Sequence, residues 1–218
     1  MCDFAAEKGD LELLKLLRAK GCPWGEMTCA LAAEGGHLEM LKWAHANGCP
    51  WDTQTCSQAA GGGHLEMLKW ARANGAPWYV ETCKSAAGGG HLEMLKWLRV
   101  NECPWDKWTC ISAARGGHLE VLQWARANGC PWGAAMCSYA KGGHLEMLKW
   151  LRAKGCPWGK LTCSNAAKGG HLETLKWVRA NGCPWGANGC PWGDEGAFPP
   201  AYNLEVLQWL HQEGCPWV

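Results

Sequence analysis

The stretch Gly-Gly-His-Leu-Glu-Met-Leu-Lys-Trp stands unchanged at residues 35–43, 62–70, 89–97 and 142–150. Near copies occur at 116–124 and 169–177, and looser copies begin at Gly9 and at Tyr202. The histidines of successive copies are 26 or 27 residues apart. A segment that recurs at a short, fixed period is typical of tandem repeat proteins. We therefore expect an array of similar units and no single active site.

Each repeat is expected to contain two helices, as residues 52–78 illustrate. Residues 52–60 predict a short first helix that three glycines end, and residues 64–74 predict the second helix. The apolar residues of the second helix recur three and four positions apart, which places them on one face. Asn74-Gly75 ends that helix, because glycine readily adopts the left-handed conformation needed there. A proline two residues later prevents its continuation.

One repeat cannot bury its apolar face alone, so its neighbours must cover it. We therefore predict an all-α fold, an α-solenoid of stacked helix-turn-helix repeats. We expect a single repeat domain over residues 1–218, with eight units. The array is expected to be regular over 1–186 and irregular over 187–202, where a duplicated heptapeptide and two adjacent prolines disfavour a helix. A C-terminal capping helix is expected over 203–213.

The net charge of +1 gives no general attraction for nucleic acids or anionic membranes. No apolar run approaches the ~20 residues that span a bilayer. The first repeat is in phase from Met1, and the N-terminus has no signal-peptide profile. We expect a soluble monomer in the cytoplasm or the nucleus, with no nucleic acid and no membrane among its partners.

Tryptophan and cysteine are unusually frequent, with 17 Trp and 15 Cys. All but Trp108 of the tryptophans belong to two columns of the repeat, one at the end of the quoted stretch and one in Pro-Trp. Stacking on nucleobases would need interleaved basic residues. We therefore predict that the two tryptophan columns pack in the core.

The cysteines also form two columns, one before Pro-Trp and one in the first helix. Their spacing of seven residues differs from that of zinc knuckles, and equivalent cysteines of successive repeats are expected to be too far apart for disulfides. One repeat has Ala76 in place of the cysteine before Pro-Trp, which indicates packing. We predict buried structural thiols and no metal site or cofactor, and a Cys-rich metal-binding protein stays open as a weaker alternative.

The histidine of the quoted stretch could suggest a metal ladder or a general base. The same position holds Asp10 in the first repeat and Asn203 in the last, and both residue types are good N-caps. We predict that the histidines cap the second helix or brace the turn before it. A general base needs a nucleophile beside it, and the repeat offers none. No catalytic residue is predicted.

The pattern Ala-Ala-x-Gly-Gly-His-Leu-Glu-Met-Leu-Lys-Trp resembles the helical part of the ankyrin repeat. The unit is shorter here, because ankyrin repeats run to about 33 residues and carry a β-hairpin that Cys-Pro-Trp and a few residues replace. The resemblance implies a helical solenoid that binds proteins through its concave side. It implies no catalytic residues and no enzymatic activity.

Residues that differ between repeats are candidates for specificity, because those needed for stacking must recur. They cluster at the turn and the first helix, on the side that the resemblance makes concave. Early repeats carry acidic residues there and later ones basic residues, with Trp108 as the main anchor candidate. The predicted partner-binding residues are Glu26, Met27, Glu34, Gln54, Gln58, Tyr79, Glu81, Lys107, Trp108, Arg115, Tyr139, Lys141, Lys160 and Lys168.

The sequence thus favours a non-catalytic module that binds another protein. Random drift on a solvated surface is an open alternative for the charge pattern. A fragment or degenerate copy of a larger repeat protein, without a specific partner, is an open alternative for the function. One further expectation concerns Glu102, which replaces the glycine that ends the second helix elsewhere. Glu102 must adopt a positive φ or end that helix differently.

Overall fold

A computed structural model of the chain describes residues 1–133, 136–140, 143–159, 161–185 and 204–215. All regular secondary structure in these residues is helical, which confirms the all-α prediction. The helices are α1 (Cys2–Lys8), α2 (Leu11–Ala19), α3 (Glu26–Glu34), α4 (Leu38–Ala46), α5 (Thr53–Gly61), α6 (Leu65–Ala73), α7 (Val80–Gly88), α8 (Leu92–Val100), α9 (Lys107–Gly116), α10 (Leu119–Ala127), α11 (Met136–Tyr139), α12 (Leu145–Ala153), α13 (Thr162–Lys168), α14 (Leu172–Ala180) and α15 (Leu204–Gln212).

The helix boundaries follow the repeat. The first and second helices expected over 52–60 and 64–74 are α5 and α6, each displaced by no more than one residue at either end. The glycine after the second helix adopts the left-handed conformation as predicted, with φ of 89° at Gly75. The irregular segment predicted over 187–202 lies outside the described residues, and the single-domain arrangement and the capping role of α15 stay predictions.

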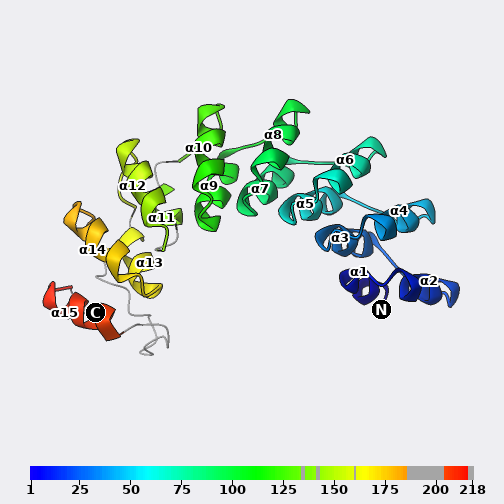
Figure 1. Cartoon of the computed structure of the whole chain (residues 1–218), viewed down its shortest axis with the longest axis horizontal. Coiled ribbons are helices and arrows are strands. Elements are labelled where there is room, and N and C mark those ends of the chain that lie inside the picture. Colours follow the sequence, from blue (N-terminus) through cyan, green and yellow to red (C-terminus); the bar gives the residue numbers. More distant parts are fainter. Residues whose placement is uncertain (134–135, 141–142, 160, 186–203, 216–218) are drawn as a thin grey trace. The chain divides into compact units, whose positions relative to one another are not determined.

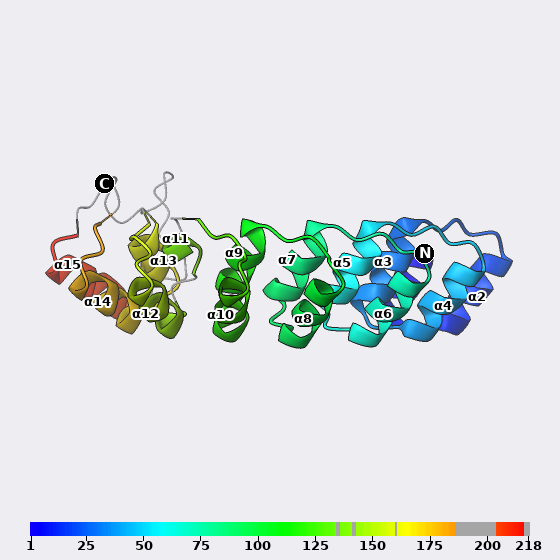
Figure 2. The same ribbon diagram turned by 90° about the horizontal axis from the view of Figure 1, so that it is seen from above.

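The described chain forms two compact units. Unit 1 comprises Met1–Ala113 and Glu120–Pro131, and unit 2 comprises Ala114–Leu119 and Trp132–Val218. In unit 1 the first helices α1, α3, α5 and α7 pack in succession, and the second helices α2, α4, α6 and α8 form a separate row beside them (Figure 1). The segments that join one repeat to the next run along one edge of this unit (Figure 2).

The core of unit 1 lies between the two rows of helices. The second helix contributes its Leu and Met, such as Leu68 and Met67, and the first helix contributes the Ala-Ala pair, such as Ala59 and Ala60. All four side chains are buried. Small residues on the first helix let the next repeat approach closely. The opposite face of the second helix carries ion pairs between Glu and Lys three residues apart.

The prediction that the tryptophan columns pack in the core is corrected by the structure. Where the structure describes them, the tryptophans of both columns lie at the edge of the core and are only half-buried. The Pro-Trp residue of one repeat meets the helical tryptophan of the next repeat edge to face. Trp78 and Trp97 illustrate this contact, with 5.8 Å between ring centroids. On its other side Trp78 contacts the guanidinium of Arg72 at 4.3 Å. The indole of Trp78 is thus covered in part by a cation and in part by a second indole.

The histidines hold the N-cap position of the second helix, but their side chains make no capping hydrogen bond. They brace the stack instead. His91 Nε2 lies 2.9 Å from the carbonyl oxygen of Gly61, the last residue of α5, which is the first helix of the preceding repeat. Because a carbonyl can only accept, Nε2 donates, and it satisfies a carbonyl that the helix leaves open. Asp10 is a true cap, accepting from the Leu13 amide at 2.9 Å.

In the pairs Gly35-Gly36 and Gly62-Gly63 the second glycine leaves room for the histidine ring of the next repeat, and the first leaves room for the histidine of its own repeat. A Cβ on Gly63 would lie 2.6 Å from Cε1 of His91, and Gly63 has a φ of 79°. A Cβ on Gly36 would meet His64 in the same way at 2.5 Å. The second glycine is therefore required by a left-handed backbone and by close contact with the next repeat, whereas the first is required by contact with the histidine of its own repeat.

Glu102 adopts the left-handed conformation, with a φ of 61°, so the first of the two expectations is confirmed. Among the described residues it is the one non-glycine with a positive φ. Glu102→Gly is expected to raise the free energy of unfolding by about 1 kcal/mol, because the left-handed conformation costs an L-residue roughly this much. Chemical denaturation measures the change, and an unchanged transition midpoint would contradict the strain.

Candidate interaction surface

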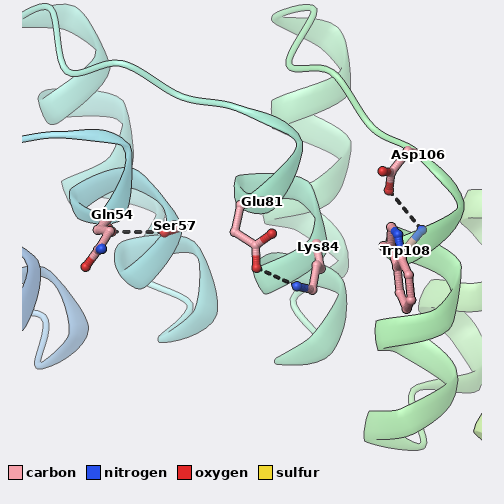
Figure 3. A network of polar contacts seen from close by, with 6 residues as sticks. All are labelled: Gln54, Ser57, Glu81, Lys84, Asp106 and Trp108. Atoms are coloured by element: carbon pink, nitrogen blue, oxygen red, sulfur yellow. Dashed lines mark hydrogen bonds and ion pairs between the residues drawn. The ribbon is translucent and has the colours of Figure 1, made fainter.

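The first helices of unit 1 begin with variable residues at equivalent positions. The position just before the repeated Thr-Cys holds Met27, Gln54, Glu81 and Trp108 in four successive repeats. All four side chains are exposed. We call these four residues the variable row. Figure 3 shows that Gln54, Glu81 and Trp108 lie at the start of successive first helices, on the same side of the stack.

Two kinds of N-cap hold the row in place. Where the cap is aspartate, its carboxylate accepts from the backbone amide of the row residue, as Asp106 does from Trp108 at 2.8 Å. Asp52 does the same for Gln54 at 2.8 Å. Where the cap is Gly or Tyr, the hydroxyl of the repeated threonine accepts from the cap amide instead, as in Tyr79. The backbone of each row residue is therefore fixed before any partner arrives.

The centre of the row is polar and partly paired. Glu81 forms an ion pair with Lys84 one turn later, with 2.6 Å between Oε1 and Nζ (Figure 3). In the preceding repeat, the Ser57 hydroxyl donates to the backbone oxygen of Gln54 at 3.1 Å. The Glu81–Lys84 pair is solvent-exposed and contributes only a few tenths of a kcal/mol. Because the pair is weak, Glu81 and Lys84 can exchange it for ion pairs with a ligand.

The ends of the row are apolar. Met27 is 49% exposed and Trp108 is 39% exposed, although both are large hydrophobic side chains. Tyr79, at the cap position of α7, is 62% exposed. The Lys107 ammonium lies 5.8 Å from the centroid of the Trp108 ring. Large apolar side chains that stay in water on a well-packed scaffold are typical of contact surfaces.

An acidic pocket adjoins the Met27 end of the row. It has a volume of about 410 Å³. Its acidic residues are Asp3, Glu26 and Asp52, and its apolar walls include Trp24 and Met27. One oxygen of Asp3 accepts the Thr28 hydroxyl at 2.5 Å, which fixes that carboxylate. Three carboxylates beside apolar walls favour a cationic side chain with an alkyl stem.

The remaining predicted residues fall into three groups. In unit 1, Glu34 is exposed at the end of α3 and Gln58 is half-buried in α5. In unit 2, the Arg115 guanidinium lies 5.0 Å from the ring centroid of the half-buried Tyr139, and Lys168 is exposed. Lys141 and Lys160 lie outside the described residues.

Sequence reasoning missed Asp3, Asp52 and Trp24, which line the pocket. Asp3 follows the cysteine of the first helix, at the position of Ala30, Ser57 and Lys84 in the next repeats. That column was identified as variable from the second repeat onward, so extending the alignment to the first repeat would have found Asp3. Nothing in the repeat pattern shows that Asp52, two repeats later, reaches the same pocket.

The repeat architecture agrees with known proteins. A family model described as ankyrin repeats (many copies) matches residues 29–72 and again residues 56–99. The matched stretch, residues 29–99, is similar to ankyrin repeats. This confirms the resemblance seen in the sequence, with the shorter unit and the missing hairpin as the points of difference. Ankyrin repeats are generally protein-interaction modules and are typically non-catalytic.

The fold of the chain is similar to the crystal structure of the human ASB11 ankyrin repeat domain, with a TM-score of 0.55 and 19% sequence identity. The alignment covers 72% of this chain and 84% of that chain. At this identity the likeness concerns the fold alone. Comparison with curated proteins gives no significant match. None of the described helices is both long and apolar enough to cross a membrane.

Proposed function

We propose that the chain binds another protein through the variable row and the adjoining acidic pocket of unit 1. The observation that carries the proposal is the exposure of Met27 and Trp108 at equivalent positions of a rigid repeat, with polar residues between them. Figure 1 places the first helices, which bear the row, on the inner side of unit 1. The resemblance to ankyrin repeats implies partner binding on this side.

The dimensions of the row suggest the form of the ligand. Helices of neighbouring repeats pack about 8–10 Å apart, so Met27 and Trp108, three repeats apart, are separated by roughly 25–30 Å. An extended peptide covers this distance with about eight residues. A segment of the partner in extended conformation therefore fits the row, with one anchor at each end.

The charges of the surface suggest the chemistry of the anchors. The pocket beside Met27 is acidic, so that end accepts a lysine or arginine whose alkyl stem lies on Trp24 and Met27. The other end offers the exposed face of Trp108, which accepts an apolar or aromatic residue. We propose a partner segment that carries a basic residue about eight positions from an apolar one.

A random peptide library displayed on phage tests the proposal on the full chain. Selected peptides should carry the basic and apolar residues at the stated separation. Trp108→Ala should weaken their binding by at least about 10-fold, because truncation of a hot-spot residue costs about 1.4 kcal/mol or more. Glu26→Lys should weaken the same peptides by reversing charge at the pocket, as fluorescence polarisation would measure.

Two controls separate the row from the rest of the surface. Val100, 82% exposed on the second helix α8, can be changed to alanine without touching the row, and Val100→Ala should bind like the unaltered protein. Circular dichroism verifies that each variant keeps its helices. Peptides whose affinity depends on Val100 and is indifferent to Trp108 and Glu26 would place the binding surface elsewhere. Failure to select any peptide would favour a repeat protein without a specific partner.

A further inference from the structure

Five repeats each bring together two cysteines that are far apart in the sequence. The cysteine of the first helix and the cysteine before Pro-Trp, about 20 residues later, meet in the interior of the same repeat. Cys163 Sγ and Cys183 Sγ lie 2.7 Å apart, closer than two non-bonded sulfur atoms normally approach. In four other repeats the thiol of the corresponding cysteine is the main cause that raises the pKa of the first-helix thiol, so the two side chains are close together there too, in the pairs Cys29–Cys49, Cys83–Cys103, Cys110–Cys130 and Cys137–Cys156.

One repeat lacks the second thiol and serves as a natural control. Cys56 faces Ala76, and its Sγ lies 3.9 Å from the Ala76 carbonyl oxygen. The corresponding distance from Cys83 to the Cys103 carbonyl is 3.8 Å. The backbone geometry of the site is therefore the same whether the second residue is cysteine or alanine. Only the second sulfur is missing.

The second thiol changes the acidity of the pair. Without a partner, burial raises the pKa of the Cys56 thiol to about 12. In a complete pair, the hydrogen bond donated by the Cys137 thiol stabilises the thiolate of Cys156 and lowers its pKa to about 6. The cysteine before Pro-Trp is thus the sulfur of the pair that is most easily deprotonated.

The pairs are unsuited to a structural metal ion. Zinc in proteins takes four ligands, usually Cys and His. Within the part of the chain that the structure describes, no group of three or more His, Cys, Asp or Glu side chains could hold a metal ion. Two sulfurs without further ligands are instead the reactants of disulfide formation, which needs them to move only to a separation of about 2.0 Å.

We propose that these five cysteine pairs are oxidation sites, at which a hydroperoxide converts the two thiols of one repeat into a disulfide. The disulfide joins the first helix to the connection after the second helix, so it closes a loop within one repeat. It restricts the unfolded chain more than the folded one. Oxidation should therefore stabilise the stack one repeat at a time and leave the variable row unchanged.

The reaction balances with one hydroperoxide for each pair. The thiolate sulfur of Cys183 attacks hydrogen peroxide, the O–O bond breaks, and a sulfenic acid and hydroxide form. The Cys163 thiol then attacks the sulfenic sulfur, so that the S–S bond forms and the S–O bond breaks with release of water. Hydroxide takes the proton that Cys183 lost. The two thiols give up two electrons in total, and the peroxide becomes two molecules of water.

The pairing can be mapped on the full chain after treatment with hydrogen peroxide. Remaining thiols are alkylated, and a tryptic digest without reductant is analysed by mass spectrometry. A lysine or arginine lies between the two cysteines of every pair, so each disulfide yields a cross-linked peptide. Cross-links should occur within the five pairs, while Cys56 is recovered alkylated. The melting temperature should rise by several degrees and fall again after reduction.

Two variants sharpen the test. Neither should disturb folding, because the position before Pro-Trp holds cysteine in most repeats and alanine in one. Ala76→Cys should create a new cross-link to Cys56, and Cys183→Ala should remove the cross-link of Cys163 alone. Circular dichroism verifies the fold of each. An Ala76→Cys variant that folds normally while Cys56 stays reduced would overturn the proposal.

The unaltered chain offers further outcomes that would overturn it. These are cross-links that mainly join different repeats or different molecules, or oxidation of Cys56 as extensive as that of the paired cysteines. The proposal would also be overturned if the thiols stay reduced under conditions that oxidise free glutathione. Elemental analysis of the same sample would reveal thiophilic metal as the cause of such resistance, and metal-bound pairs would replace the oxidation sites.

Discussion

Gly63→Ala is expected to lower the free energy of unfolding by about 3 kcal/mol. An alanine with a φ near 79° costs about 1–2 kcal/mol for the left-handed backbone alone. The added methyl would also lie 2.6 Å from Cε1 of His91, so the ring of the next repeat must move away. That movement breaks the hydrogen bond from His91 to Gly61. Equilibrium denaturation in urea measures the loss.

Neighbouring glycines supply matched controls. Gly75 has a φ of 89°, but a Cβ there meets nothing within 4 Å, so Gly75→Ala should lose only about 1–2 kcal/mol. Gly61 is the last residue of α5 and a Cβ there makes only ordinary contact, so Gly61→Ala should gain up to about 0.5–1 kcal/mol. Adding His91→Ala to Gly63→Ala should recover part of the loss. Equal effects of Gly63→Ala and Gly75→Ala would show that the histidine contact is unimportant.

Leu68→Ala is expected to lower the free energy of unfolding by about 3 kcal/mol. Leu68 is 0% exposed in α6, in the middle of unit 1, and truncation of such a leucine leaves a cavity that the surrounding helices cannot close. The midpoint of urea denaturation should fall accordingly. Leu16→Ala provides the control, because Leu16 is 53% exposed on α2 and its truncation should cost less than about 0.5 kcal/mol.

The position of the cavity in the stack should also matter. Repeats contact only their neighbours, so a defect in a central repeat weakens contacts on both sides. Leu14 is also 0% exposed, but it lies in α2 of the first repeat. Leu14→Ala should therefore unfold that end locally, with a broader transition than Leu68→Ala. Identical transition shapes for the two variants would contradict nearest-neighbour coupling.

The candidate surface was only partly visible in the sequence. Comparison of the repeats selected Met27, Glu81 and Trp108 because these positions vary while their surroundings recur. The acidic pocket was not foreseen, because Asp3 belongs to the first repeat and Asp52 to the third, and they meet only when α1, α3 and α5 are packed. Assignment of partner binding to either feature remains a proposal that the peptide selection tests.

The cysteines show most clearly where pattern reasoning stops. Burial was predicted correctly, because a column that accepts Ala76 must pack a small side chain. Spacing along the chain directed attention to cysteines seven residues apart, as possible metal ligands, and to equivalent cysteines of successive repeats, as possible disulfides. The actual neighbours, such as Cys163 and Cys183, are separated by both helices of one repeat. Their contact depends on how the second helix folds back on the first, which spacing along the chain does not reveal.

The sequence by itself determined the helices and their order, because apolar periodicity and the glycines and prolines that end helices act over a few residues. It also determined that repeats stack, since no single repeat buries its own apolar face. Only the tertiary structure decided the role of Gly-Gly-His, where a histidine ring lies on the glycines of the preceding repeat. It likewise decided the edge position of the tryptophans and the pairing of the thiols, because these depend on distances between residues some 20 to 30 positions apart in the chain.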